Sequence, residues 1–237
     1  MSLFLTSDLH LGHANIMKYS KRPGLTDEEL KLLEQEEKWD IEDSQMKKDG
    51  KVPPQRSRFK PCASSVARMD KYLIDNINDM VQPDDVLWHL GDFCFGSGFS
   101  SNAGNKGSDN PIAERYRHSL QCKNIHLIWG NHDNYSIRNY FSSASDMHTL
   151  RWEGQDMVLC HYAMVTFNKS HRGVWHLYGH SHSGLEKWMD EHMPGRRSMD
   201  VGVDNAYKIF GSYRPFAFKE IRDIFKNRLG FSADHHK

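Results

Sequence analysis

Apolar residues in this chain are concentrated in short runs separated by longer polar segments. Five runs of four or five residues are rich in Val, Ile, Leu and aromatic side chains, and they cover residues 3–6, 86–90, 125–129, 157–160 and 175–178. Uninterrupted runs of this length are typical of buried strands. Helices are expected near 15–19, over 66–80, over 111–120 and from 221 to 229, the last ended by Gly230. The pattern therefore predicts an α/β fold.

Two segments stand apart from this alternation. Residues 25–64 read as a polar insertion, in which Thr26 to Glu29 has capping-box spacing before a helix with a partial apolar stripe of Leu30, Leu33 and Ile41. Nine acidic residues between positions 27 and 43 are followed by a basic loop over 47–60. The two charged halves either neutralise each other in solvent, or the basic loop acts as a lid or phosphate-steering element. Residues 95–110 are rich in Gly, Ser and Asn and predict a loop, and a further strand is expected over 200–203.

Each of the five apolar runs leads into residues that can bind a metal ion. The blocks that follow them are Asp8-Leu9-His10, Gly91-Asp92, Gly130-Asn131-His132-Asp133, His161 and Gly179-His180-Ser181-His182. Open α/β sheets place their sites just beyond the carboxyl ends of the strands. Five such blocks in succession therefore indicate one shared site.

Composition narrows the class of protein without deciding the function. The chain has 237 residues and 31 basic against 31 acidic side chains, so no global charge indicates nucleic acid. The four cysteines are widely spaced, which argues against a zinc ribbon or a disulfide scaffold. The first strand begins at Leu3, which leaves no room for a signal peptide, and no apolar stretch reaches the length of a membrane span. We expect a cytoplasmic protein without a membrane partner. Of its 15 histidines, His89 and His176 lie inside predicted strands and are expected in the core.

Taken in order, the blocks resemble the calcineurin-like metallophosphoesterase superfamily from Asp8 to His182. The opening block through Gly12-His13-Ala14-Asn15 and the later Gly202-Val203-Asp204 are similar to compact bacterial and phage members. The resemblance implies a two-layer mixed β-sandwich flanked by helices. It also implies a single domain over 1–237, with 25–64 as a charged insertion or lid and 231–237 as a tail.

The resemblance also implies two divalent ions. Asp8, His10, Asp92 and His182 would hold the first ion, and Asp92, Asn131, His161 and His180 the second, with Asp92 as the bridge. Mixed oxygen and imidazole ligands suit Mn, with Fe, Zn or Ni as alternatives, better than Ca or Mg.

The histidine after Asn131 falls outside this ligand set. In the family the residue that matches His132 faces the scissile phosphate, where it protonates the leaving oxygen or stabilises transition-state charge. Asp133 could orient that imidazole. His13 could reach the substrate phosphate or pack within its loop, and Arg196 and Arg197 could bind phosphate or form a solvated pair.

The implied reaction is hydrolysis of a phosphate ester by in-line attack of a hydroxide that bridges the two ions. A phosphodiesterase is favoured, because small members that resemble this chain often accept diesters. The alternatives are a phosphomonoesterase acting on a nucleotide or small metabolite, and a nuclease whose basic loop with Phe59 binds a nucleic-acid strand. A scaffold protein on the same fold is the non-enzyme alternative, but such members typically lose ligands that are all present here.

Overall fold

The computed structural model describes residues 1–95, 110–231 and 233, and it divides into two compact units. The main unit combines Met1–Leu11 with Leu73–Lys237, and the inserted unit is Gly12–Tyr72. Residues 96–109 of the loop predicted over 95–110 lie outside the described residues, as does most of the predicted tail at 231–237.

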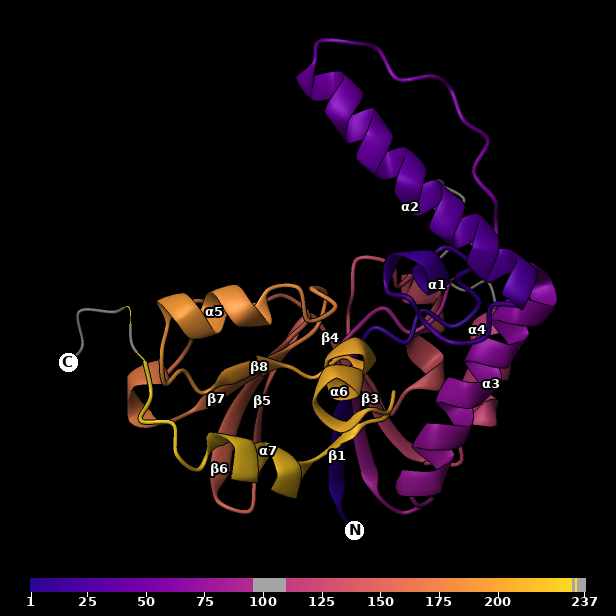
Figure 1. Ribbon diagram of the computed structural model, residues 1–237. Coiled ribbons are helices and arrows are strands. Elements are labelled where there is room, and N and C mark those ends of the chain that lie inside the picture. The colour runs from indigo at the N-terminus through magenta and orange to yellow at the C-terminus, as the bar shows by residue number, and fades with distance from the viewer. Residues whose placement is uncertain (96–109, 232, 234–237) are drawn as a thin grey trace. The chain divides into compact units, whose positions relative to one another are not determined.

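Two mixed sheets form the main unit (Figure 1). The first has the order β4-β3-β2-β1-β9 and consists of β1 (Leu3–Thr6), β2 (Val86–His89), β3 (Asn124–Ile128), β4 (Ser143–Ser145) and β9 (Phe216–Ala217). The second has the order β5-β6-β7-β8 and consists of β5 (Met147–Trp152), β6 (Gln155–Cys160), β7 (Trp175–Tyr178) and β8 (Ser198–Asp200). Among the described strands, β9 and β5 run antiparallel to their neighbours and the other pairs are parallel. All five predicted strands are present, and the predicted α/β class is confirmed.

An apolar core is shared by the two sheets. Leu5 of β1 and Leu159 and Leu177 of the second sheet are fully buried in the same cluster, which α7 joins through Ile221 and Phe225. Burying each such side chain contributes about 1.5–3 kcal/mol. The shared core holds the ends of both sheets at fixed positions relative to each other.

The described part of the main unit also contains helices, and some of their bounds differ from the prediction. They are the C-terminal part of α3 (Ala63–Met80), α4 (Pro111–Ser119), α5 (Glu186–His192), α6 (Val203–Phe210), α7 (Phe218–Phe225) and the 3₁₀ helices η1 (Tyr135–Tyr140) and η2 (Ser170–Arg172). The strand predicted over 200–203 is displaced, because β8 ends at Asp200 and Val203 already begins α6. Gly230 does not end the last helix, which stops at Phe225 and leaves Leu229 exposed. None of the helices in the described ranges has the length and apolar character needed to cross a bilayer.

The inserted unit contains α1 (Ile16–Tyr19), α2 (Asp27–Lys48) and the first part of α3. The predicted capping box is present: Thr26 Oγ1 accepts the N–H of Glu29 at 3.2 Å, and Glu29 accepts the N–H of Thr26 at 2.9 Å. The expected apolar stripe is wrong, because Leu30 and Ile41 are exposed.

After α2 the chain returns alongside the helix (Figure 1). Arg58 pairs with Asp40 at 2.6 Å and Arg56 pairs with Glu42 at 2.8 Å. The acidic and basic halves thus neutralise each other, as one of the two interpretations expected. Both acidic partners are largely exposed, so each pair adds little to stability. A lid function for this segment stays a prediction.

Candidate metal centre

The seven predicted ligands all lie just beyond the carboxyl ends of strands. Asp8 and His10 follow β1, Asp92 follows β2 and Asn131 follows β3 in the first sheet, while His161 follows β6 and His180 and His182 follow β7 in the second. Hydrogen bonds join the ends of the two sheets: the backbone N–H of His180 donates to Asp8 Oδ2 at 2.9 Å, and that of Val203 donates to Ser7 O at 3.2 Å. The ligand-bearing edges of both sheets therefore meet.

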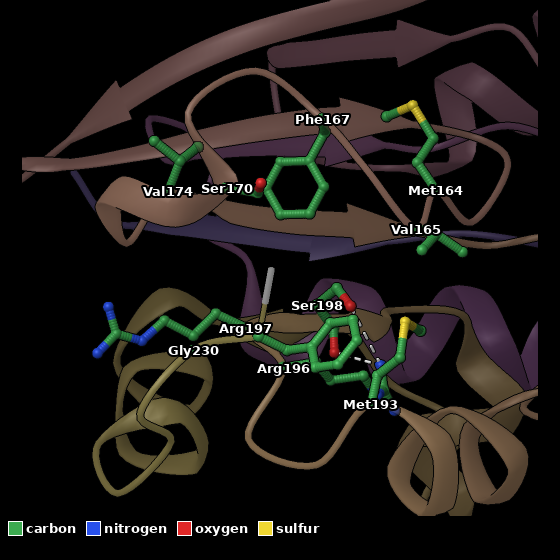
Figure 2. A pocket seen from close by; sticks show the side chains of 11 residues that line it. Met164, Val165, Phe167, Ser170, Val174, Met193, Arg196, Arg197, Ser198 and Gly230 are labelled. Carbon is green, nitrogen blue, oxygen red and sulfur yellow. Dashed lines mark hydrogen bonds between the residues drawn. The ribbon is translucent and has the colours of Figure 1, made fainter. Parts of the chain in front are cut away.

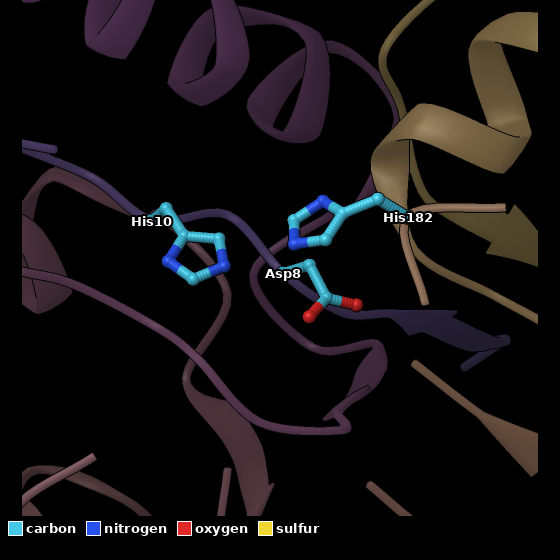
Figure 3. A group of neighbouring side chains, drawn as sticks. All are labelled: Asp8, His10 and His182. Atoms are coloured by element: carbon cyan, nitrogen blue, oxygen red, sulfur yellow. The ribbon is translucent and has the colours of Figure 1, made fainter. Parts of the chain in front are cut away.

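Six of these side chains form two groups, each with one carboxylate and two imidazoles. The first group is Asp8, His10 and His182, drawn in Figure 3, and the second is Asp92, His161 and His180. Within each group the candidate ligand atoms lie within 4.8 Å of one another. Each group contains three of the four residues of one predicted ion set, and the assignment of ions to these residues stays a prediction.

Asp92 belongs to the second group and also lies close to the first. Its Oδ2 is 3.5 Å from Nε2 of His10 in the first group and 3.5 Å from Nε2 of His161 in the second. Its Oδ1 accepts the backbone N–H of His132 at 2.8 Å, which fixes the rotation of the carboxylate. One oxygen of Asp92 thus faces both groups, as a bridging ligand must.

Asn131 adds a neutral oxygen to the second group. Its Oδ1 is 3.1 Å from Nε2 of His161 and 2.9 Å from Nδ1 of His180. Nδ1 of His161 lies 2.7 Å from the carbonyl of Leu90, so this nitrogen carries the proton and Nε2 faces the site.

Strained backbone is concentrated at this centre. Five of the seven ligand positions have a left-handed φ between 46° and 67°, namely Asp8, His10, Asp92, His180 and His182. This conformation costs a non-glycine residue roughly 1–2 kcal/mol and persists only where surrounding contacts enforce it. The loops also approach closely, because a Cβ on Gly130 would stand 2.2 Å from Asp92 Oδ1.

The family model of the calcineurin-like phosphoesterases matches residues 1–227. This chain is a calcineurin-like phosphoesterase. The phosphoesterase is similar to the uncharacterized protein MJ1445 of Methanocaldococcus jannaschii, with 24% identity over 207 residues that cover 85% of this chain and 81% of that protein. Its fold is similar to that of AQ665, a protein of unknown function from Aquifex aeolicus, with a TM-score of 0.53 and 17% identity over 94% of this chain and 98% of that one.

Membership implies divalent metal ions, and the donor set of this phosphoesterase fits them. Each group offers one carboxylate and two imidazoles, and Asn131 adds a carbonyl oxygen to the second. Such mixed donors suit first-row transition metals.

Burial and neighbouring charges shift the pKa values of several groups at the centre. Burial, together with the nearby Asp200, raises the pKa of Asp8 to about 7. Burial also opposes ionisation of Asp92, but the hydrogen bond and charge of His161 hold its pKa well below the usual range. Burial likewise opposes the charge on His161, yet contact with Asp92 raises the pKa of this imidazole to about 9. At neutral pH a metal ion would therefore compete with protons at the centre of this phosphoesterase.

His132 lies next to the first group. Its ring is 5.3 Å from that of His10 and 5.7 Å from that of Phe95, both in edge-to-face geometry. The expected role of Asp133 needs correction, because its carboxylate binds backbone: it accepts the N–H groups of Asp92, Phe93 and Gly130, each at 2.9 Å. Asp133 thus holds the Asp92 loop against the Asn131 loop.

The three predicted substrate contacts have different surroundings. His13 belongs to the inserted unit, so its role at the site stays a prediction. Arg196 is only 2% exposed and binds Glu186 and Asp190, each at 2.9 Å, so a solvated pair is wrong for this residue. Figure 2 shows Arg196 and Arg197 lining a pocket beside Met164 and Phe167, with Arg196 bonded to Ser198. Because its guanidinium is already paired with two carboxylates, we do not expect Arg196 to bind the substrate phosphate.

Three residues near the centre were missed as site residues in the sequence. Asp200 and Asp204 contact the loop that carries His180 and His182, and Tyr162 packs its ring against His161 and His180. Asp200 ends a strand, so the rule that found the ligands could have found it too. Asp204 belongs to the Gly202-Val203-Asp204 block that resembles compact family members, but that resemblance gave it no role, and Tyr162 carries no comparable signal.

Proposed function

We propose that this phosphoesterase is a phosphodiesterase with a dinuclear metal centre. The observation that carries this proposal is the position of Asp92 Oδ2, at 3.5 Å from an imidazole nitrogen of each group. Two ions held about 3.5–4 Å apart clamp the attacking and leaving oxygens of an in-line displacement. A carboxylate oxygen between the groups reduces the repulsion between such ions.

The seven ligands would hold the ions, with Mn²⁺ as our first choice. Bound there, the ions supply Lewis acidity and lower the pKa of a water molecule to near neutrality. His132 then stands beside the reacting phosphate, where it donates a proton to the leaving oxygen or stabilises developing charge.

Two aromatic rings support a diester substrate. Phe95 contacts His132, whereas Tyr162 contacts His161 and His180 and is 47% exposed. The rings touch different members of the site, so each can pack against a separate organic substituent of the phosphate. A monoester offers only one such substituent.

A hydrolysis panel with added Mn²⁺ tests the proposal. It compares a generic phosphodiester, a phosphomonoester, cyclic nucleotides and single-stranded DNA for the wild-type protein and the Asp92→Asn variant. We expect the diester to be cleaved fastest and the variant to lose at least about 10²-fold in rate, because it removes the bridging charge.

Asp85→Asn is the matched control. Asp85 precedes β2 whereas Asp92 follows it, and both carboxylates are buried and accept backbone N–H bonds. This control should keep wild-type turnover. Near-normal turnover by Asp92→Asn would contradict the dinuclear assignment, and a faster monoester reaction would contradict the substrate class.

A further inference from the structure

The loop that carries His180 and His182 has an unusual backbone. Within four residues, His180, His182 and Ser183 have φ values of 67°, 46° and 61°. Side chains must enforce this conformation, since each residue would otherwise relax to a less strained state.

Carboxylates bind this loop along its backbone. Asp8 accepts the N–H of His180 at 2.9 Å. Asp200, which is fully buried, accepts the hydroxyl of Ser181 at 2.8 Å and the N–H of Ser183 at 2.9 Å. These bonds fix the path of the chain but leave the imidazole of His182 to be oriented by another group.

Asp204 contacts that imidazole directly. Its Oδ2 is 2.6 Å from Nδ1 of His182, and the side chain is 7% exposed at the start of α6. A carboxylate only accepts hydrogen bonds, so Nδ1 carries the proton and Nε2 keeps its lone pair. Nε2 is then the atom with which His182 would bind an ion together with Asp8 and His10 (Figure 3).

We propose that Asp204 is a positioning residue for the first ion, acting through His182. The inference rests on the dinuclear centre of the proposed function, and it adds a residue that supports binding of the first ion but not of the second. The carboxylate fixes the tautomer and ring angle of His182 and makes its Nε2 a better donor. Asp204 contacts His182 of the first group, whereas the imidazole of His161 in the second group is oriented by the carbonyl of Leu90.

Metal binding by Asp204→Ala tests this role. We expect the affinity for one ion to fall about 10- to 100-fold while the other ion binds within about threefold of the wild type. At limiting Mn²⁺ the wild-type protein should show the electron paramagnetic resonance signal of a spin-coupled pair, and the variant that of a single ion. Excess Mn²⁺ should restore the coupled signal, and Asp204→Asn, which keeps a carbonyl acceptor, should show a smaller loss.

Asp85→Ala is the control, since Asp85 is also 7% exposed but lies at the opposite end of β2 from the ligands. Equal weakening of both ions, or wild-type affinity for both, would overturn the inference. So would failure of both Asp204 variants to fold in the presence of a chelator, because the residue would then be needed for folding. If the wild-type protein binds two ions but cleaves no phosphate ester, the proposed function fails while this comparison still decides the role of Asp204.

Discussion

Asp92 accepts the backbone N–H of His132 at 2.8 Å through Oδ1, and this bond leaves Oδ2 facing both imidazole groups. The residue that would bridge two ions and the residue that would act on the leaving group are therefore joined through the backbone. Asp133 reinforces the junction, because it binds the N–H groups of both Asp92 and Gly130. Hydrogen bonds between two adjoining loops thus fix the distance between Asp92 and His132.

His132→Gln should reduce turnover without removing metal. General acid catalysis is worth about 10²–10⁴-fold, and none of the seven ligands is altered. If His132 protonates the leaving oxygen, the loss should be large for an alkyl leaving group and much smaller for p-nitrophenolate, which leaves without a proton. Steady-state rates on the two diesters, with metal content measured on the same samples, check this.

An equal loss on both substrates would instead assign His132 to stabilising transition-state charge. Loss of metal from the variant would contradict both roles.

Gly130→Ala should disrupt the centre through steric conflict. The new Cβ would stand 2.2 Å from Oδ1 and 2.3 Å from the backbone nitrogen of Asp92, so one of the two loops must shift. We expect retained metal and turnover to fall at least about tenfold, since roughly 1 Å of misplacement has effects of this size or more. Gly154→Ala is the control for backbone strain alone, because its φ of 84° disfavours a side chain while no atom of the described residues outside its immediate neighbours lies within 4 Å of its Cβ position. Equal metal content in the two variants would contradict the argument.

Metal affinity should rise with pH between 7 and 9. The pKa of His161 is raised to about 9, so below that pH its imidazole holds a proton that a bound ion must displace. The apparent affinity should therefore gain about tenfold per pH unit over this range and level off above it, with a steeper dependence below pH 7 where Asp8 also binds a proton. Calorimetric titration with Mn²⁺ in oxygen-free buffers of different ionisation enthalpy measures the proton release directly. An affinity that is constant from pH 7.5 to 9 would exclude this coupling.

Acid should destabilise the fold through His176, which is fully buried in β7 as its position in a predicted strand suggested. Burial lowers its pKa from 6.5 to about 4, and Nε2 accepts the N–H of Met164 at 3.0 Å in the neutral form. The unfolded chain binds the proton more readily than the folded one. The contribution of His176 to the free energy of unfolding, on the order of 3 kcal/mol, is therefore fully present above pH 6.5 and is lost as pH falls toward 4.

Urea unfolding at pH 7 and pH 4.5, with a chelator present, measures that loss. His176→Gln keeps a donor and an acceptor without titrating in this range, so it should lose less stability on acidification than the wild type. His192→Gln, which removes an exposed imidazole, is the control and should behave like the wild type. The same pH dependence in all three proteins would rule out His176 as the cause.

Local patterns in the sequence were sufficient for the strands and for the polar residues that follow them. An apolar run such as 86–90 has few ways to be buried other than as a central strand, and its polar successor Asp92 must then lie at the edge of the sheet. The start of the acidic helix at Thr26 could also be predicted from local sequence, because its capping box involves only residues three apart.

Contacts between distant segments could not be read in this way. The bonds of Asp133 to the Asp92 loop span about 40 residues, and the imidazole of His182 reaches Asp204 across a change from strand to helix. The left-handed backbone at five ligand positions exists only because both sheets and their loops enforce it together. The sequence by itself thus determined which side chains end the strands. The tertiary structure decided which oxygen of Asp92 faces both groups and which carboxylate orients His182, because these depend on where separate loops meet.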